Sequence, residues 1–317
     1  MTKAIAVTVE NFPRAETDRM FKSLAEKAGG SNRWHHDREP GSIDDQRVIR
    51  QNRDTLYSLV IADITDGATL TIPDAGDRYM SVMIVNEDHY INRVFHSGGT
   101  YELTTDEFDT PWVLVASRIL VDPADPADIA AVNTLQNGLK IETGSTAEFE
   151  MPDYDTASFD EVREALLTLS RHLEKFAHAF GKRSEVDPVL HLIATANGWG
   201  GLPDEEARYS TIEPHLPVGD YELTVHDVPV DAFWSISVYN KAGFFEKNDK
   251  GMYSVNSVTA VKNDDGSTTV RFGDGDLPNT IPIMGEWNYA VRMYQPRKEI
   301  LDGSWTFPSV TPSASGE

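Results

Sequence analysis

Short runs of β-branched and aromatic residues follow one another through the first half of this chain, with tight turns and no helical pattern between them. Residues 55–65 and 68–73 are two such runs, and Asp66–Gly67 between them is a strong β-hairpin signal. Similar runs continue at 78–86 and 112–121. This spacing predicts an antiparallel β-sandwich or jelly roll and argues against a doubly wound α/β fold, which needs helices between strands.

Helical patterns flank this β-rich region. Apolar residues at helical spacing predict a helix over about residues 13–28, followed by the stop signal Gly29–Gly30. The longest apolar stripe predicts a second helix over residues 158–180. Ser158 and Glu161 are spaced as a capping box at its start. These two segments are the main helical elements that we expect.

A shorter helix is predicted over residues 187–197, ending at the glycine-rich stretch 198–201. Strand patterns return after Pro217, with Asp264–Asp265–Gly266 as another hairpin turn. The later strands are expected at residues 221–226, 232–239, 253–261, 268–272 and 289–294. The helices therefore separate two β regions.

These patterns predict a mainly β fold with a helical insert, made of two antiparallel, jelly-roll-like β-sandwich domains joined by an α-helical segment. The expected parts are an N-terminal helix with a polar lead-in, a first sandwich, a helical segment, a second sandwich and a frayed tail. Their expected bounds are 1–45, 46–150, 151–216, 217–310 and 311–317.

The two β regions also resemble each other, which predicts an internal duplication. The matching stretches are Leu70–Ile72 with Ser81–Asn86 in the first half, and Leu223–Val225 with Ser235–Asn240 in the second. Each half later has a strand that bears an arginine and runs into a proline, at Arg118 and Arg292. Chance similarity between short β segments is the alternative.

Composition limits the partners and the compartment. The 317 residues contain 51 acidic and 28 basic side chains, and the net charge of −23 repels phosphate backbones, which argues against nucleic acid. No apolar run reaches the roughly 20 residues that span a bilayer, and the N-terminus lacks a signal-peptide core. We expect a cytoplasmic protein without membrane contact. The absence of cysteine excludes disulfides and thiolate chemistry.

Several standard catalytic motifs are missing. The chain has no G-x-S-x-G, no G-x-x-x-x-G-K-[ST], no H-E-x-x-H and no G-x-G-x-x-G. It also lacks the H-x-H that a metal-binding cupin needs. We therefore assign no metal ligand, and the identity of any cofactor stays open.

The segment most typical of a ligand site is residues 47–58, where three arginines lie beside a carboxylate, an amide and hydroxyls. Guanidinium groups present planar donor forks to carboxylates or phosphates, so we expect a small anionic substrate. The candidate substrate-binding residues here are Arg50, Asn52, Arg53 and Thr55. The alternative is that Arg53 and Asp54 form internal ion pairs that hold the fold together.

Three residues are candidates for catalysis: Asp54 or His89 as the acid or base, and Tyr57 as a hydrogen-bond donor. Trp199 lies between glycines and is a candidate lid over the substrate. The structural alternatives are a solvated loop for His89 and a packing role for Trp199 between helix and sheet.

The motif Arg50-x-Asn52–Arg53–Asp54–Thr55-x-Tyr57–Ser58 resembles the domain of unknown function 1254. The motifs Ala232–Phe233–Trp234–Ser235 and Leu301–Asp302–Gly303–Ser304–Trp305 resemble its usual companion, the domain of unknown function 1214. This resemblance implies a two-domain jelly-roll-type protein with a helical segment. It implies no particular reaction, because the family has no settled catalytic residues.

Two hypotheses follow from the sequence. The first is a hydrolase-like enzyme that acts on a small anionic or ester-like metabolite bound at the arginine-rich segment. The second is a non-catalytic ligand-binding or assembly protein that uses its sandwich surfaces, including assembly into a homo-oligomer. Sandwich folds serve many unrelated functions, so the fold does not decide between them.

Overall fold

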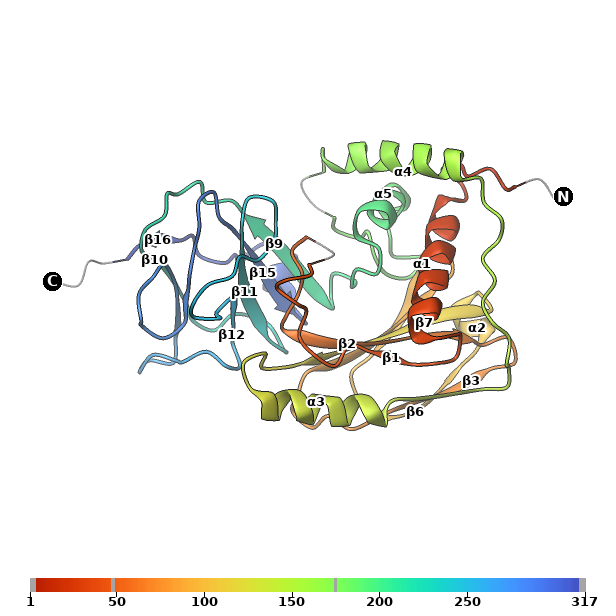
Figure 1. Cartoon of the computed structure of the whole chain (residues 1–317), viewed down its shortest axis with the longest axis horizontal. Coiled ribbons are helices and arrows are strands. Elements are labelled where there is room, and N and C mark those ends of the chain that lie inside the picture. The colour runs from red at the N-terminus through yellow and green to blue at the C-terminus, as the bar shows by residue number, and fades with distance from the viewer. Residues whose placement is uncertain (1–3, 47–48, 174–175, 314–317) are drawn as a thin grey trace. The chain divides into compact units, whose positions relative to one another are not determined.

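Most of the backbone hydrogen bonding lies in four β-sheets, seen in a computed structural model that describes residues 4–46, 49–173 and 176–313. The described residues form sixteen strands and six helices (Figure 1). They divide into two units, each drawn from three segments of the chain. Unit 1 comprises Met1–Arg38, Leu56–Leu120 and Ala127–Asp204, and unit 2 comprises Glu39–Thr55, Val121–Pro126 and Glu205–Glu317. The expected mainly β fold with a helical insert is confirmed.

Unit 1 contains two sheets. The larger has the strand order β1-β2-β7-β4-β5 and the smaller has the order β6-β3-β8, with every neighbour antiparallel where the register is described. The strands are β1 (His35–His36), β2 (Thr55–Asp63), β3 (Ala68–Ile72), β4 (Met80–Asn86), β5 (Ile91–Phe95), β6 (Gly99–Leu103), β7 (Trp112–Leu120) and β8 (Lys140–Thr143). β4 is buried along its whole length, as expected for a central strand covered on both faces.

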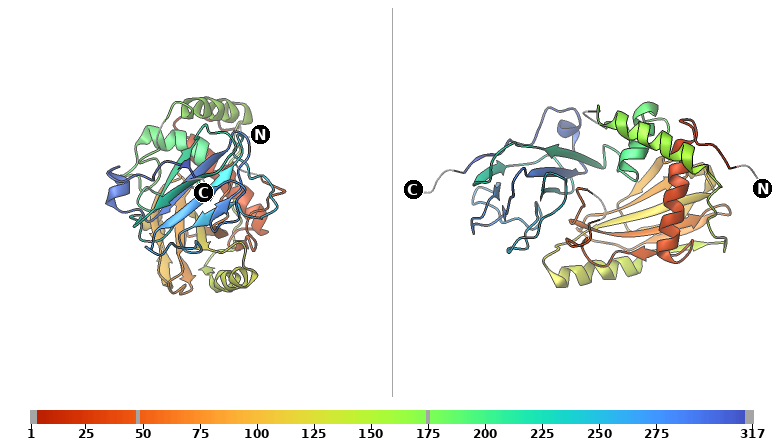
Figure 2. Two further views of the ribbon diagram at one scale, coloured as in Figure 1. Left: turned by 90° about the vertical axis from the view of Figure 1, so that its left-hand side faces the viewer. Right: turned by 45° about the horizontal axis from the view of Figure 1, so that its top comes forward.

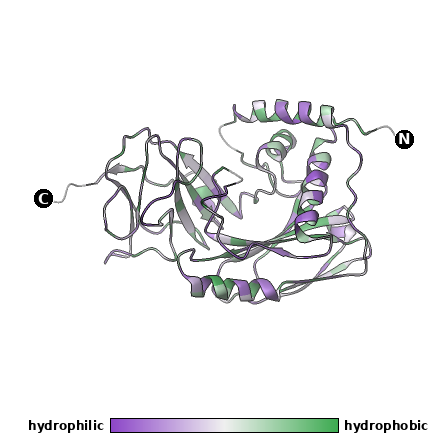
Figure 3. Cartoon of the chain, viewed as in Figure 1, coloured by the Kyte–Doolittle hydropathy of each residue, from purple (hydrophilic) through white to green (hydrophobic). Residues whose placement is uncertain are grey.

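The helices of unit 1 are α1 (Phe12–Ala28), α2 (Thr105–Phe108), α3 (Pro126–Gly138), α4 (Thr156–Ser170) and α5 (Pro188–Gly198). Figures 1 and 2 show α1 and α4 on the same side of the sheet that holds β7. Phe12 of α1, Phe159 of α4 and Ile193 of α5 share one apolar cluster. Hydrophilic and hydrophobic residues alternate around α1 and α4 in Figure 3, which is the pattern of a helix with one buried face.

Three helical expectations differ from the structure. The helix expected at 158–180 ends at Ser170, although Leu173 and Phe176, which belong to no helix, still pack against the same apolar cluster. Residues 174–175 of the expected helix lie outside the described residues. Its N-cap is Asp155, whose side chain accepts from the Ser158 amide, so the Ser158–Glu161 capping box is wrong. α3 was not expected, because only two of its residues are buried and its apolar stripe is weak.

Unit 2 also contains two sheets. Their strand orders are β12-β11-β15-β9 and β14-β13-β10-β16. The strands are β9 (Ala207–Ile212), β10 (Tyr221–Val225), β11 (Trp234–Tyr239), β12 (Ser254–Asn256), β13 (Thr268–Phe272), β14 (Thr280–Ile281), β15 (Asn288–Tyr294) and β16 (Thr311–Pro312), and α6 is Lys298–Leu301. A core of apolar side chains from β10, β11, β13 and β15 fills this sandwich, with Trp234, Phe272 and Trp287 among its largest members.

Both units have the same strand topology. The order β2-β7-β4-β5 in unit 1 corresponds to β9-β15-β11-β12 in unit 2, and β6-β3-β8 corresponds to β13-β10-β16. The pairing register also agrees, because Ser81 faces Arg118 across β4 and β7 while Ser235 faces Arg292 across β11 and β15. These serines and arginines are those that suggested the repeat in the sequence. The shared order and register support an internal duplication.

The unit bounds cut across the expected parts at several places. Residues 39–55, which the sequence pattern divides between the lead-in and the first sandwich, group with unit 2. Residues 311–312 of the expected tail pair with β10 as the short strand β16. Residues 47–48 of the arginine-rich segment and 314–317 of the tail lie outside the described residues.

Candidate functional site

Asp54 is buried in unit 2, at the end of the segment that precedes β2. Its Oδ2 accepts a 2.6 Å hydrogen bond from Ser235 Oγ on β11, and the Arg292 guanidinium on β15 is the charge that acts on it most strongly. Burial raises the pKa of Asp54, and the charge of Arg292 opposes that rise. Ser235 and Arg292 alternate along their strands with the core residues Trp234, Ile236, Val291 and Met293, so Asp54 is buried against the face of this sheet that points away from the sandwich core.

Arg292 fastens this segment to the sheet. Its Nη1 donates to Ser237 Oγ at 2.9 Å, and its Nη2 donates to the Arg50 carbonyl and to the Tyr239 hydroxyl, both at 2.7 Å. The Tyr239 hydroxyl in turn donates to the Gln51 carbonyl at 2.9 Å. Two backbone carbonyls of the arginine-rich segment thus find donors in buried side chains of β11 and β15.

Asn52 and Arg53 are also bonded within unit 2, whereas Arg50 Nε and Gln51 Oε1 are buried without a hydrogen-bond partner among the described residues. Asn52 Nδ2 donates to Tyr294 Oη at 2.9 Å and to Thr55 Oγ1 at 3.2 Å, and its Oδ1 accepts from the Asp54 amide at 2.9 Å. Arg53 donates to the Gly41 carbonyl, and its guanidinium lies 5.5 Å from the Tyr253 ring centroid. Asn52 and Arg53 thus have hydrogen-bond partners in their own chain, and the substrate-binding roles of Arg50, Asn52, Arg53 and Thr55, like the internal-pair alternative, stay predictions.

His89 belongs to unit 1 and is fully buried after β4. Its Nδ1 is 2.8 Å from Thr195 Oγ1, and its Nε2 accepts from the Gly200 amide at 2.9 Å. Thr195 already donates its single hydroxyl proton to the His191 carbonyl at 2.8 Å, so His89 Nδ1 must carry the hydrogen. His89 is thereby held as the neutral Nδ1–H tautomer, and burial lowers its pKa well below the ordinary value.

Aromatic rings enclose His89. The Trp199 ring stacks on it with centroids 5.4 Å apart and planes 12° apart, and the His191 ring stacks at 5.4 Å. Trp199 Nε1 also donates to Thr17 Oγ1 on α1 at 3.1 Å. Trp199 therefore packs between α1 and the β4–β5 turn, and its role as a lid stays a prediction.

Tyr57 on β2 is joined to the same region. Its ring lies 5.5 Å from the Arg118 guanidinium, and Arg118 Nη2 donates to the Gly200 carbonyl at 2.9 Å. Gly200 donates to His89 on its other side. Of the predicted site residues, unit 1 brings together Tyr57, His89 and Trp199, and unit 2 brings together the five from Arg50 to Thr55.

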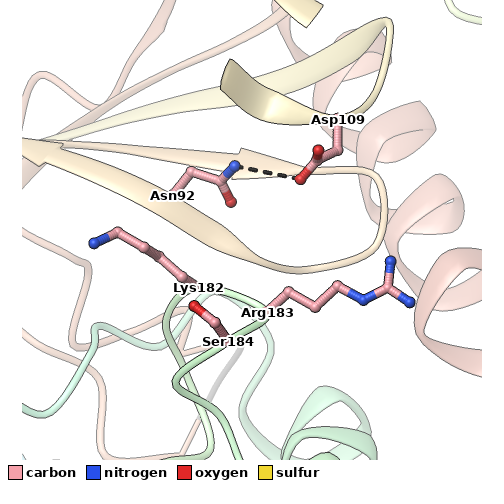
Figure 4. Close-up of a pocket in the computed structure, with 5 residues that line it drawn as sticks. All are labelled: Asn92, Asp109, Lys182, Arg183 and Ser184. Carbon is pink, nitrogen blue, oxygen red and sulfur yellow. Dashed lines mark hydrogen bonds between the residues drawn. The ribbon is translucent and has the colours of Figure 1, made fainter. Parts of the chain in front are cut away.

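A hollow of about 350 Å³ opens on unit 1 (Figure 4). It is lined by Asn92 of β5, Asp109 after α2, and Lys182, Arg183 and Ser184 of the loop before α5. Figure 4 shows the Lys182 and Arg183 side chains extending in opposite directions from this loop. No sequence pattern predicts this site, because two adjacent cations in a polar loop form no motif.

The two cations of the hollow differ in their partners. Lys182 Nζ lies 3.1 Å from Glu185 Oε1, in a pair that is about half exposed. Arg183 lies 6.0 Å from the Tyr90 ring centroid and has no carboxylate partner in the described part of the chain. The Asn92 amide donates to the Glu107 carbonyl and reaches Asp109 at 3.5 Å. The hollow thus presents one guanidinium that the chain itself does not neutralise.

A cluster of ionisable groups lies where α1 meets the β4–β5 turn. Arg14 of α1 pairs with Asp88 at 2.8 Å and lies 4.0 Å from Glu87. Asp18, one turn further along α1, accepts a 2.7 Å hydrogen bond from the Tyr154 hydroxyl. Glu87 and Asp88 directly precede the candidate base His89 in the sequence, and nothing in their spacing joins them to Asp18 or Tyr154.

Neither a metal centre nor a membrane span is found in the described ranges. No three His, Asp or Glu side chains there are arranged to hold a metal ion. None of the helices in those ranges has the length and apolar character that crossing a membrane requires.

Comparison with known proteins shows that the fold occurs in solved structures, and it indicates no activity. A Vibrio parahaemolyticus protein (VPA0106) is similar in structure with a TM-score of 0.76 and 16% identity, over 96% of this chain and 98% of that chain. A putative uncharacterised protein from Burkholderia cenocepacia is similar with a TM-score of 0.52 and 13% identity, over 96% and 88%. No protein of curated function matches the chain.

Two family matches agree with the motifs found in the sequence. Residues 31–103 match the family described as protein of unknown function DUF1254, and residues 213–298 match protein of unknown function DUF1214. The order along the chain is the one that the motifs predicted. The chain thus matches DUF1254 in its N-terminal part and DUF1214 in its C-terminal part.

Proposed function

We propose that this protein binds a small anionic molecule in the hollow of unit 1, through Lys182 and Arg183. The observation that carries the proposal is the Arg183 guanidinium, which lines the hollow without a carboxylate partner in the described residues. Acidic side chains outnumber basic ones by 51 to 28 in this chain, so partners for an exposed cation are plentiful. A guanidinium that lines a hollow without a carboxylate partner favours an external carboxylate or phosphate.

The surrounding groups fit the same class of ligand. The Ser184 hydroxyl supplies a further neutral hydrogen-bond donor at the rim. The loop itself is fixed at its start, because the Gly181 carbonyl accepts from the Ile91 amide at 2.9 Å, and the Glu185 amide closes a turn on the Lys182 carbonyl at 2.9 Å. Asp109 on the opposite wall would repel a bulky anion and favours one of small size.

The ligand is still the small anion expected from the sequence, but Lys182 and Arg183 bind it in place of the arginine-rich segment. Asp54 and His89 have buried side chains that are bonded to their own chain, so acid–base use of either would require these hydrogen bonds to break. A hydrolase-like reaction at Asp54, His89 and Tyr57 therefore stays a prediction from the sequence. Binding is the part of the function that the geometry supports best.

The test is an NMR titration of ¹⁵N-labelled protein with succinate and with inorganic phosphate, followed at the amides of Asn92 and Ser184. We expect saturable shifts for one of the two anions, with a Kd raised at least about tenfold in Arg183→Gln, since a charge-assisted contact contributes about 1.5–3 kcal/mol. Lys262→Gln removes one exposed cation of unit 2 and serves as the matched control. Absent or non-saturable shifts, or equal weakening by both variants, would contradict the proposal.

A further inference from the structure

The His191 ring of α5 lies between two backbone carbonyl groups of unit 1. Its Nδ1 is 3.1 Å from the Ala179 carbonyl oxygen, and its Nε2 is 3.2 Å from the Asp88 carbonyl oxygen. Carbonyl oxygens only accept hydrogen bonds, so both contacts are hydrogen bonds only when both ring nitrogens carry a hydrogen. A neutral imidazole has one such hydrogen, and His191 is 3% exposed, which leaves little room for water to replace the missing donor.

The two carbonyl groups belong to the two walls of the hollow. Ala179 is in the loop whose residues 182–184 form one wall. Asp88 is in the turn before β5, the strand that contributes Asn92 to the other wall. A doubly protonated His191 ring therefore joins both walls through hydrogen bonds, whereas a neutral ring donates to only one of them.

Tyr90 connects the His191 ring to the guanidinium that lines the hollow. The Tyr90 and His191 rings stack with centroids 4.6 Å apart and planes 11° apart. The Arg183 guanidinium lies 6.0 Å from the centroid of the same Tyr90 ring. A positive charge on His191 therefore lies near enough to attract an anion that is bound at Arg183.

We propose that His191 is the positioning residue that makes anion binding in the hollow depend on pH. A second proton on its ring fastens both walls and adds a positive charge behind them, and both effects raise the affinity for the anion. His191 does not line the hollow, so it acts through Ala179 and Tyr90 and not by contact with the ligand. The inference rests on the proposed function and adds the regulation of that same site.

The groups around the ring determine when the second proton is taken up. Asp88 and His89 face the ring from the β4–β5 turn, and Tyr90 stacks on it. Arg183 lies beyond Tyr90 on the loop. Burial lowers the pKa of His191, against the raising effects of the two carbonyls and of the Asp88 charge. The free protein therefore has a neutral ring at pH 7, which gains its second proton below the ordinary histidine value of about 6.5.

Proton binding and anion binding must strengthen each other by the same factor. If the second proton tightens anion binding, the bound anion tightens proton binding equally. The pKa of His191 should therefore rise when the anion binds. The affinity for the anion should rise as pH falls through this pKa.

The first test follows the His191 ring nitrogens in the full-length protein by long-range ¹H–¹⁵N NMR between about pH 5 and 8. The probes are sulfate and oxalate, whose charges hardly change over this range. With a saturating concentration of the anion that binds, we expect both nitrogens to become protonated as pH falls. The midpoint should lie at least about 0.7 pH units above that of the free protein, which corresponds to a fivefold coupling. A ring that stays neutral throughout, or a midpoint that the anion does not move, would overturn the inference.

The second test measures the Kd of each anion at about pH 5.5 and 7.5. We expect binding at least about fivefold tighter at the lower pH, and a ratio near one in His191→Gln, whose amide does not titrate. His178→Asn removes an exposed imidazole of the same loop and should keep the ratio. Asparagine suits this control because His178 has a φ of +59°.

The outcomes separate this inference from the proposed function. If neither anion binds at either pH, both fail together. Saturable binding with equal Kd at the two pH values would refute the role of His191 alone. So would a ratio that survives in His191→Gln or disappears in His178→Asn. If His191→Gln does not fold, the ring titration of the unmodified protein decides.

Discussion

Arg118 and Arg292 occupy corresponding positions in the repeated strand pairs of the two units, and each donates to a backbone carbonyl of a loop. Arg118 binds the Gly200 carbonyl at 2.9 Å, and Arg292 binds the Arg50 carbonyl at 2.7 Å. Each guanidinium also lies near a tyrosine ring, Tyr57 at 5.5 Å and Tyr239 at 5.9 Å. In each unit, the repeated arginine therefore holds a non-strand segment of the chain to the sheet through a backbone carbonyl.

Replacing Arg292 should destabilise the protein strongly. Arg292→Met takes from the buried Asp54 carboxyl the cation that acts on it most strongly, and it removes the hydrogen bonds to Ser237, Tyr239 and the Arg50 carbonyl. We expect a loss of about 3–5 kcal/mol in the free energy of unfolding, measured by urea denaturation. The double variant with Asp54→Asn should recover part of this loss, because it removes the uncompensated charge. Equal stability of Arg292→Met and the unmodified protein would refute the assigned role.

His89 should remain neutral wherever the protein is folded. Its Nδ1 donates to Thr195 and its Nε2 accepts from Gly200, so long-range ¹H–¹⁵N spectra should show the Nδ1–H tautomer. Because the folded pKa is lowered, the unfolded chain binds the extra proton, and stability from this group is lost as pH falls below about 6.5. An Nε2–H tautomer, or a titration of the ring near pH 6.5, would contradict this structure.

Trp199 offers a test between packing and lid roles. Trp199→Phe should keep the stacking on His89 and lose the hydrogen bond to Thr17, at a cost of about 1 kcal/mol. Trp199→Ala should cost about 3 kcal/mol, since the rings of His89 and Phe21 lose their neighbour. Thermal unfolding measures both. A lid that merely closes over a substrate would leave both variants as stable as the parent protein.

The glycines beside Trp199 should respond differently to alanine. A Cβ at Gly201 would lie 2.5 Å from the Phe180 ring, which is too close for any real contact, so Gly201→Ala should cost about 1–3 kcal/mol. Gly200 has a φ of +78° and open space around it, so Gly200→Ala should cost only about 1 kcal/mol of backbone strain. Gly275 has neither constraint and is the matched control. A tolerated Gly201→Ala would mean that Phe180 can move aside.

Local sequence patterns predicted much of the fold. Alternating strands and turn residues such as Asp66–Gly67 predicted most of the sheets, and stop signals placed the ends of α1 and α5 within a residue or two. The end of α4 could not be predicted, because the apolar stripe continues past Ser170 although the backbone does not stay helical. Hydrophobic spacing reports burial in that stretch and leaves the backbone conformation open.

The candidate sites could not be predicted in the same way, because they form through contacts between residues that are far apart in the sequence. Asp54 lies 238 positions before Arg292 in the chain, and the sequence marked both residues without pairing them. The Asp18–Tyr154 hydrogen bond likewise joins positions 136 residues apart. Such contacts follow from the topology of the sheets, which a single sequence specifies only coarsely. The repeat was the exception, because Ser81, Ser235 and the two arginines could be compared with each other.

Because residues 39–55 group with unit 2, this unit can finish folding only late in synthesis. This segment leaves the ribosome early, whereas β11 and β15, which bind it, are made some 180 to 240 residues later. Asp54 must therefore stay in water until almost the entire polypeptide exists. A fragment that begins at residue 205 would contain both sheets of unit 2. It would still lack the Asp54 carboxyl and the backbone carbonyls that bind the buried Arg292. Neither unit can therefore be produced as one continuous piece of the chain.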